Sequence, residues 1–109
     1  MQPDQFMTRT LREQPWGKDV AQVLAAAIRG ADPYQVTARH INLDGDYLHL
    51  GAQTFPLRRL PRILVVGAGK AGLPMTQAAV DVLGSRISDG LVIVKEGYGG
   101  PERVGAVRI

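Results

Sequence analysis

The chain has 109 residues, of which 45% are hydrophobic and 6% aromatic, a formal net charge of +3 and no cysteine. The length suits one small domain with a modest core, and the lack of cysteine excludes disulfides, a thiol nucleophile and cysteine metal sites. The mild charge and few aromatics give no reason to expect a nucleic-acid partner, and no apolar segment approaches the roughly 20 residues that span a bilayer. With no secretory pattern at the start, we expect a cytoplasmic protein without nucleic-acid or membrane partners.

The first forty residues predict helices. A mixed polar stretch over 8–14 favours a short helix, which Pro15 interrupts. Asp32 followed by Pro33 is the start signal of a further short helix that ends near His40. Between them, from about 18 to 30, apolar residues recur at helical spacing and form one stripe, which consists of Val20, Val23, Leu24, Ala27 and Ile28.

A small β-hairpin is expected next. Asp44-Gly45 is a tight-turn signal between two short apolar runs, 41–43 and 47–50. In the second run, leucines alternate with Tyr47 and His49, which indicates one solvated face.

The middle of the chain predicts a βαβ unit. Ile63–Val66 is a continuous apolar run, as expected of a strand buried on both faces. A helix over 71–83 follows and ends at Gly84. The sequence ISDG, residues 87–90, is interpreted as a turn before a second buried strand over 91–94. Two parallel strands joined by a helix form a right-handed crossover.

The elements together predict an α/β fold class, with a Rossmann-like βαβ core of parallel strands preceded by N-terminal helices and a small β-hairpin. Residues 104–109 begin another strand, and a sheet of two or three strands has a bare edge. We therefore expect residues 1–109 to be a truncated α/β domain from a longer protein. The expected partner is the remainder of its own chain, and a homo-oligomer formed through the bare edge stays open.

Three glycines follow the first strand of this unit. Gly67-x-Gly69-x-x-Gly72 matches the dinucleotide-binding fingerprint, but the acid expected at the tip of the second strand is poorly placed, because Lys95 comes first and Glu96 is late. A structural turn that uses glycine only for its positive φ is a second interpretation.

A P-loop is excluded at this turn. Leu64 stands where its first glycine would be, and Ala71 replaces the Ser or Thr that holds magnesium. Lys70 is expected at or near the first turn of the following helix, where the positive end of the macrodipole disfavours a cation. Its place indicates an anionic partner, unless the side chain simply reaches into water.

Two short segments carry a resemblance to a known family. GAGKA, residues 67–71, and VKEGYG, residues 94–99, resemble the N-terminal part of the glycerate 2-kinase family, the class II glycerate kinases, some of which are labelled hydroxypyruvate reductase. AAIRGADP, residues 26–33, and the hairpin over 43–50 are also similar to that family, so the resemblance covers most of the chain.

The resemblance implies an enzyme that transfers the γ-phosphoryl group of ATP to D-glycerate, with Mg²⁺, in a cleft between two α/β domains. Lys70 matches the family lysine, and its implied catalytic role is to neutralise charge on the substrate or the transferring phosphoryl group. The implied nucleotide-binding positions are Gly67, Gly69, Gly72, Lys95 and Gly97.

Three further expectations follow from the same reasoning. No magnesium ligand set can be drawn from this chain, since Asp81 and Asp89 are better explained as helix-surface and turn residues. We expect the chain alone to be inactive, because half of the cleft is absent. An NAD(P)H-dependent hydroxypyruvate reductase and a non-catalytic α/β binding or assembly module stay open as alternatives.

Overall fold

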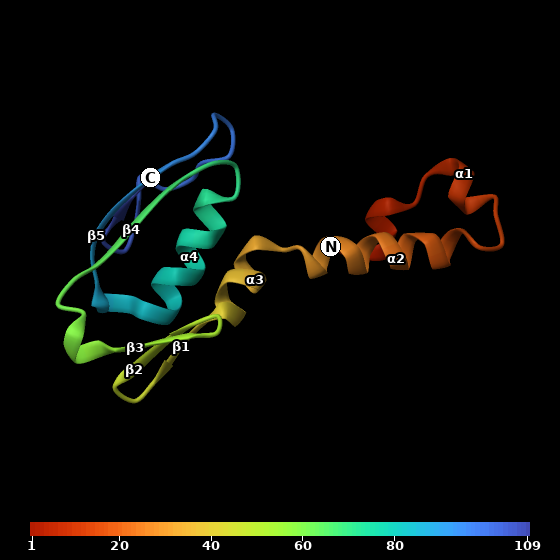
Figure 1. Ribbon diagram of the computed structural model, residues 1–109. Helices are drawn as coiled ribbons and strands as arrows, with labels where there is room; N and C mark the ends of the chain where they lie inside the picture. The colour runs from red at the N-terminus through yellow and green to blue at the C-terminus, as the bar shows by residue number, and fades with distance from the viewer. The chain divides into compact units, whose positions relative to one another are not determined.

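The computed structural model describes residues 1–109, which form two compact units. The N-terminal unit is Met1–Asp32, and the α/β unit is Pro33–Ile109. Figure 1 traces the elements of both units along the chain.

The N-terminal unit contains a 3₁₀ turn η1, Pro3–Phe6, and the helices α1, Arg9–Arg12, and α2, Gly17–Gly30. Both predicted helices are thus confirmed. The side of α2 that packs within the unit carries its small residues, and these are Gly17, Ala21 and Ala25. The predicted apolar stripe is therefore not the buried face, because close packing against η1 and α1 favours the small side chains.

The α/β unit begins with the predicted short helix. Its elements are α3 Pro33–His40, β1 Ile41–Asp44, β2 Tyr47–Leu50, β3 Gln53–Pro56, η2 Leu57–Arg59, β4 Ile63–Ala68, α4 Gly72–Leu83, η3 Gly84–Arg86, β5 Ile87–Ile93, β6 Arg103–Val104 and β7 Val107–Arg108. The expected end of α4 is confirmed, since Gly84 follows it with φ 56°.

A three-stranded antiparallel sheet follows α3, in the order β1-β2-β3. The predicted hairpin is confirmed, with Asp44 paired to Tyr47 around a two-residue turn. The third strand, β3, lacks an alternating apolar pattern and was not predicted. It pairs at the edge of the sheet, where Pro56, which has no backbone N–H, is tolerated.

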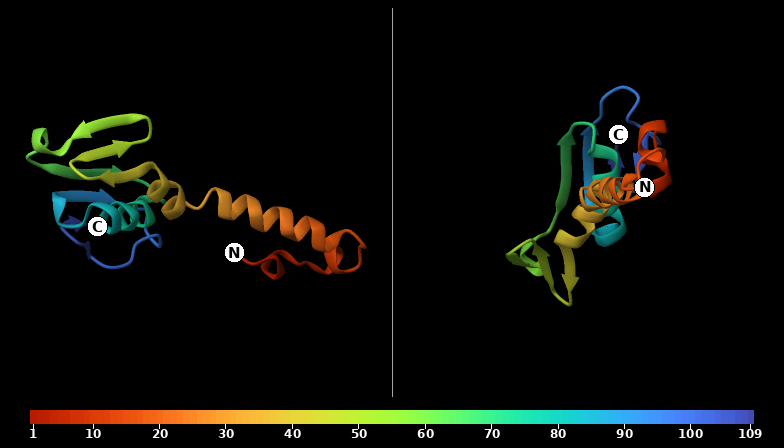
Figure 2. Two further views of the ribbon diagram at one scale, coloured as in Figure 1. Left: turned by 90° about the horizontal axis from the view of Figure 1, so that it is seen from below. Right: turned by 90° about the vertical axis from the view of Figure 1, so that its right-hand side faces the viewer.

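The main sheet has four strands in the order β4-β5-β7-β6. Strands β4, β5 and β7 are parallel, and β6 pairs antiparallel to β7. Figure 2 shows β4 (green) and β5 (blue) side by side. Helix α4 joins these two strands, so the predicted α/β fold and its βαβ unit are confirmed.

The turn predicted over 87–90 is wrong. Strand β5 already begins at Ile87, and η3 makes the turn instead. The physical reason is at Gly90, where a Cβ atom would lie 2.5 Å from the Val65 carbonyl oxygen and 3.0 Å from a Val107 methyl group. Glycine serves a close approach between strands here, rather than a turn.

The strand predicted over 104–109 is a short hairpin in the structure. Strands β6 and β7 flank Gly105, whose φ is 57°. The second of them pairs with β5, which continues the parallel sheet.

Helix α4 covers one face of the main sheet and also contacts β1 of the small sheet (Figure 1). The core on this side consists of Leu48, Ala79, Leu83, Ile87, Val92 and Val107. The opposite face, here called the outer face, is exposed and consists of Leu64, Val66, Leu91 and Ile93, with Val66 80% exposed. The prediction that β4 and β5 are buried on both faces is therefore wrong in this structure, because no element covers the outer face.

One polar contact ties α3 to α4. The Tyr34 hydroxyl donates a hydrogen bond of 2.6 Å to the Asp81 carboxylate. That hydrogen bond raises the pKa of the Tyr34 phenol above its usual value, with smaller contributions from desolvation and from the negative charge of Asp81. The contact holds α3 beside α4. Thr37 of α3 then lines the same cavity as the glycine turn after β4.

This contact predicts a loss of stability at alkaline pH. Because the folded-state pKa of Tyr34 is raised, its contribution is present below the unfolded phenol pKa of about 10 and is lost as pH rises through the folded value. Tyr34→Phe should lose less stability than the wild type over that rise, measured as the urea midpoint of unfolding. Asp81→Asn keeps a hydrogen-bond acceptor but removes the negative charge, so this variant should also lose less stability than the wild type over that rise in pH. An identical alkaline decline in all three proteins would contradict the assignment.

Candidate functional site

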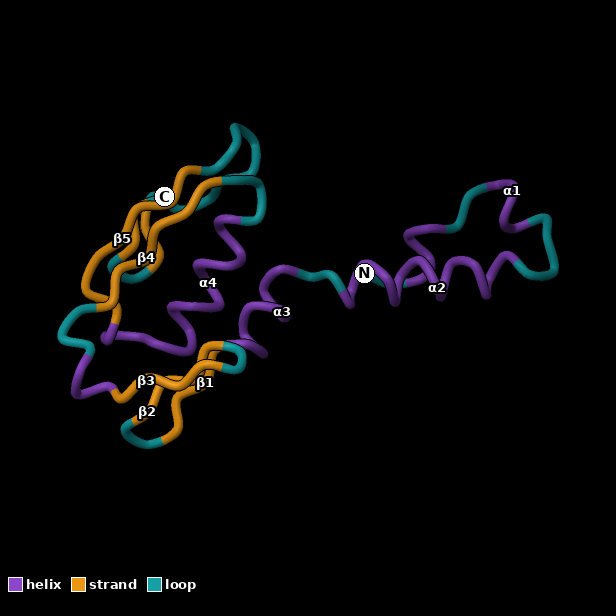
Figure 3. Tube along the Cα trace, viewed as in Figure 1, coloured by secondary structure: helices purple, strands orange, loops and turns teal.

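The carboxyl ends of β4 and β5 meet at one edge of the main sheet. The last pair in the register is Ala68 with Ile93. Lys70 is the second residue after Ala68, and Lys95 is the second residue after Ile93. Figure 3 shows the two loops that carry these lysines, in teal, next to each other at one end of the sheet. Ligands of open α/β sheets bind at this edge.

The glycine turn continues the strand pairing and then starts α4. The amide of Gly69 donates to the Ile93 carbonyl at 2.9 Å, and the amide of Gly72 donates to the Gly69 carbonyl at 3.1 Å. Ala71 is the N-cap, so Lys70 lies one residue before it. The lysine is therefore located next to the first turn of the helix, as predicted.

The three glycines have different structural requirements. Gly69 has φ 135°, which disfavours any other residue. At Gly72 a Cβ atom would lie 2.7 Å from a methyl group of Val92, so glycine allows α4 to pack closely on β5. At Gly67 the nearest atom to such a Cβ is 3.9 Å away, which is ordinary contact. Packing thus explains glycine at 72 but not at 67.

The segment after β5 folds back as a tight turn. The amide of Tyr98 donates to the Lys95 carbonyl at 2.9 Å, and Gly97 has φ 84°, the conformation that a type II turn needs at its third position. The turn places the Tyr98 ring 5.6 Å from the Nζ atom of Lys70 and 5.8 Å from that of Lys95, measured to the ring centroid. The structure therefore brings Lys70, Lys95 and Gly97 together.

These side chains form a positively charged group, here called the lysine–tyrosine cluster: Lys70, Lys95 and Tyr98. All three are exposed. Neither lysine forms an ion pair, since the salt bridges of the structure join Arg9 to Glu13 and His49 to Asp44. Two ammonium groups near one ring repel each other, and an anion bound between them would relieve that repulsion. Sequence reasoning missed Tyr98, because its contacts with the two lysines depend on the pairing of β4 with β5.

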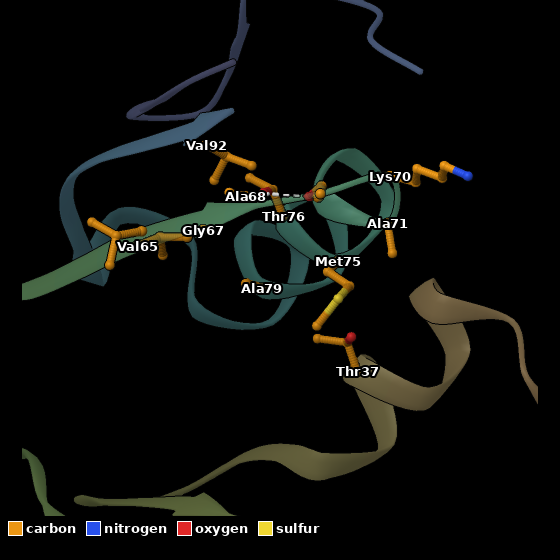
Figure 4. A pocket seen from close by; sticks show the side chains of 13 residues that line it. Thr37, Val65, Gly67, Ala68, Lys70, Ala71, Met75, Thr76, Ala79 and Val92 are labelled. Carbon is orange, nitrogen blue, oxygen red and sulfur yellow. Dashed lines mark hydrogen bonds between the residues drawn. The ribbon is translucent and has the colours of Figure 1, made fainter. Parts of the chain in front are cut away.

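A cavity of about 440 Å³ lies beside the glycine turn. Its side-chain lining is mostly apolar, from β4 and α4, with Thr37 from α3. The Thr76 hydroxyl donates to the Gly72 carbonyl at 2.7 Å, so it is already satisfied. The Lys70 side chain extends away from the other lining side chains (Figure 4). Lys70 therefore belongs both to the rim of the cavity and to the lysine–tyrosine cluster, and its ammonium group points away from the apolar lining.

The start of α4 offers few amide donors to a phosphate group. The amide of Gly72 is engaged by Gly69, and Pro74, the third residue of the helix, has none. A pyrophosphate bound as in dinucleotide-binding folds uses such amides. Most of the positive charge at this edge therefore comes from the lysine side chains.

Glu96 is the carboxylate of the turn between Lys95 and Tyr98, and no salt bridge joins it to either lysine. Asp81 accepts the Tyr34 hydrogen bond, and Asp89, which lies in β5 rather than in a turn, accepts from the Gly90 amide at 2.8 Å. No group of three or more His, Asp or Glu side chains could hold a metal ion. The residues of this chain thus offer no metal site built from protein groups alone.

The fold and the edge define a class: an α/β domain with a lysine-bearing glycine turn at the carboxyl edge of a parallel sheet. Residues 19–108 match the sequence profile of a family described as a domain of unknown function, DUF4147, and the chain belongs to that family.

Two curated relatives carry related names. The chain is 37% identical over 75 residues to a protein named glycerate kinase from Danio rerio, a match that covers 69% of this chain and 14% of the relative. It is 42% identical over 46 residues to D-glycerate 2-kinase of Thermotoga maritima, which covers 42% of this chain and 11% of the relative. With the family match, they confirm the resemblance to the N-terminal part of the glycerate 2-kinase family. This chain therefore spans only a small part, 14% and 11%, of the length of these two relatives.

A solved structure supports the fold. The PH0495 protein from Pyrococcus horikoshii OT3 superposes with a TM-score of 0.65 at 27% sequence identity, over 79% of this chain and 19% of that chain.

The different needs of the glycines predict different costs of substitution. Gly69→Ala forces a side chain onto a positive φ and should destabilise the α/β unit by about 1–3 kcal/mol. Gly67→Ala, the matched control two residues earlier, should stay within about 0.5 kcal/mol of the wild type. Urea unfolding followed by circular dichroism measures both. Equal costs for the two variants would show that the turn does not have this geometry.

Proposed function

We propose that this chain is part of a kinase that transfers the γ-phosphoryl group of ATP to glycerate, giving 2-phosphoglycerate. The observation that carries the proposal is the pair of lysines, Lys70 and Lys95, at the carboxyl edge of the sheet without a carboxylate partner. The similarity to a protein named D-glycerate 2-kinase supports the choice of acceptor.

The proposed chemistry relies on positioning and on positive charge. Charge on a transferring phosphoryl group is spread over its oxygens, so cations near those oxygens stabilise the transition state. Lys70 is the proposed catalytic residue, and Lys95 and the turn at Gly97 help to hold the nucleotide phosphates. Gly67, where no packing requires glycine, and Gly69 leave the backbone open to the nucleotide. Because these residues form no metal site of protein groups alone, no step is assigned to Mg²⁺.

Two other functions are less well supported. A hydroxypyruvate reductase would bind a dinucleotide, but the engaged amide of Gly72, Pro74 and the lysine at position 95 all disfavour that mode of binding. A non-catalytic module would keep the glycine turn for its shape alone, and such a module has no need of two unpaired lysines. Titration with NADH and with ATP separates the reductase from the kinase.

The remainder of a longer chain is the proposed partner of this unit. Parallel sheets are normally covered on both faces, whereas the outer face is bare and β4 is an edge strand. A right-handed crossover to a strand beside the free edge of β4 would place its helix on the outer face, opposite α4. The glycine turn would then lie at the point where the strand order reverses, which is where such folds bind ligands.

The proposed location is the cytoplasm, where ATP is available. No helix of the structure combines the length and the apolar character that crossing a membrane requires.

Lys70→Gln tests the proposed catalytic role in the longer polypeptide that carries this domain. Loss of one charge-stabilising group should lower kcat for ATP-dependent phosphorylation of glycerate by about 10²–10³-fold, with an unchanged Tm. Lys18→Gln, a lysine of the N-terminal unit, is the matched control and should leave kcat unchanged. Unchanged turnover in Lys70→Gln would remove Lys70 from the chemistry and favour the module.

The 109-residue chain alone should show no turnover in the same assay, because the proposed cleft needs the remainder of the protein. Formation of 2-phosphoglycerate from ATP and glycerate at a rate typical of kinases, on the order of 1–100 s⁻¹, would overturn this expectation.

A further inference from the structure

The chain contains three lysines, and two of them meet at one aromatic ring. Lys70 and Lys95 come from different loops, and they would separate freely if nothing held them. Tyr98 lies within cation–π distance of both, at 5.6 and 5.8 Å. The hydrogen-bonded turn at Gly97 sets the position of the Tyr98 backbone. The ring is thus the shared contact of the two ammonium groups.

We propose that Tyr98 is a positioning residue, which holds the ammonium groups of Lys70 and Lys95 together as one dicationic anchor for the phosphate chain of a nucleotide. This rests on the proposed function for the identity of the ligand. The electron-rich face of the ring attracts each cation and offsets part of their mutual repulsion. Two preplaced cations lose less side-chain freedom on binding than two mobile ones, which favours an anion with several charged oxygens.

The chemistry of the anchor points to a di- or triphosphate rather than to a single carboxylate. A carboxylate satisfies one ammonium group well, whereas a phosphate chain presents charged oxygens to both at once. Tyr98 itself needs only its ring for this role. Its hydroxyl makes no hydrogen bond in the structure, so the ring of phenylalanine should serve equally well.

The experiment uses the 109-residue chain with ¹³C-labelled lysine, and follows the Cε protons by NMR. The ring should shift the signals of Lys70 and Lys95 upfield, while Lys18, in the N-terminal unit, is an internal reference. Tyr98→Leu should abolish these shifts and weaken binding of inorganic pyrophosphate by about two- to fivefold. Tyr98→Phe should keep both the shifts and the affinity. Acetate at the same ionic strength should bind more weakly than pyrophosphate to the wild type.

Each other outcome overturns the proposal in a distinct way. If the Lys70 and Lys95 signals of the wild type are not shifted upfield, the ring does not hold the lysines. The same conclusion follows if the upfield shifts survive in Tyr98→Leu. Shifts that vanish in Tyr98→Leu with unchanged pyrophosphate affinity mean that holding them has no effect on anion binding. No pyrophosphate binding to the wild type means that the cluster is not a phosphate anchor. The proposed kinase reaction is tested separately, since a longer protein without turnover would leave a Tyr98-dependent phosphate anchor standing.

Discussion

The parallel pairing of β4 with β5 is the constraint on which the rest of the α/β unit depends. Its register ends with Ala68 opposite Ile93, and the Gly69 amide extends it by one further hydrogen bond. Because the strands end together, the loops that follow them start side by side. Helix α4 starts directly after this edge and packs so closely on β5 that no side chain fits at Gly72. The pairing of β4 with β5 thus builds the sheet and also brings the two loops of the candidate site together.

The sequence predicted those parts whose cause is local. The end of α4 at Gly84, the turn after Asp44 and the place of Lys70 before the helix each follow from a residue preference within a few positions. The common edge for Lys70 and Lys95 could also be predicted, since parallel strands joined by a helix end on the same side. Pattern was therefore sufficient for the order of elements in the βαβ core and for the place of Lys70, whereas Lys95 was singled out by the family resemblance.

What the sequence could not predict depends on distant neighbours. ISDG has the composition of a turn, yet Gly90 lies in a strand because β4 and β7 approach it from both sides. Strand β3 has no alternating pattern and is fixed by its partner β2. Tyr98 contacts Lys70 only after β4 and β5 have paired, so no spacing within VKEGYG reveals the contact. An apolar run also does not show whether both faces of its strand are covered.

The sign of the charge at this edge limits what it can bind. The positive end of the α4 dipole, Lys70 and Lys95 all act in the same direction, and the structure places no carboxylate against either lysine. Such an edge favours a ligand with several negative charges, since each added anionic oxygen is attracted by the helix dipole and by both ammonium groups. A glycerate carboxylate carries a single charge, whereas the phosphate chain of ATP carries several. If the proposed kinase function holds, this edge is therefore better suited to the phosphate chain of the nucleotide than to glycerate.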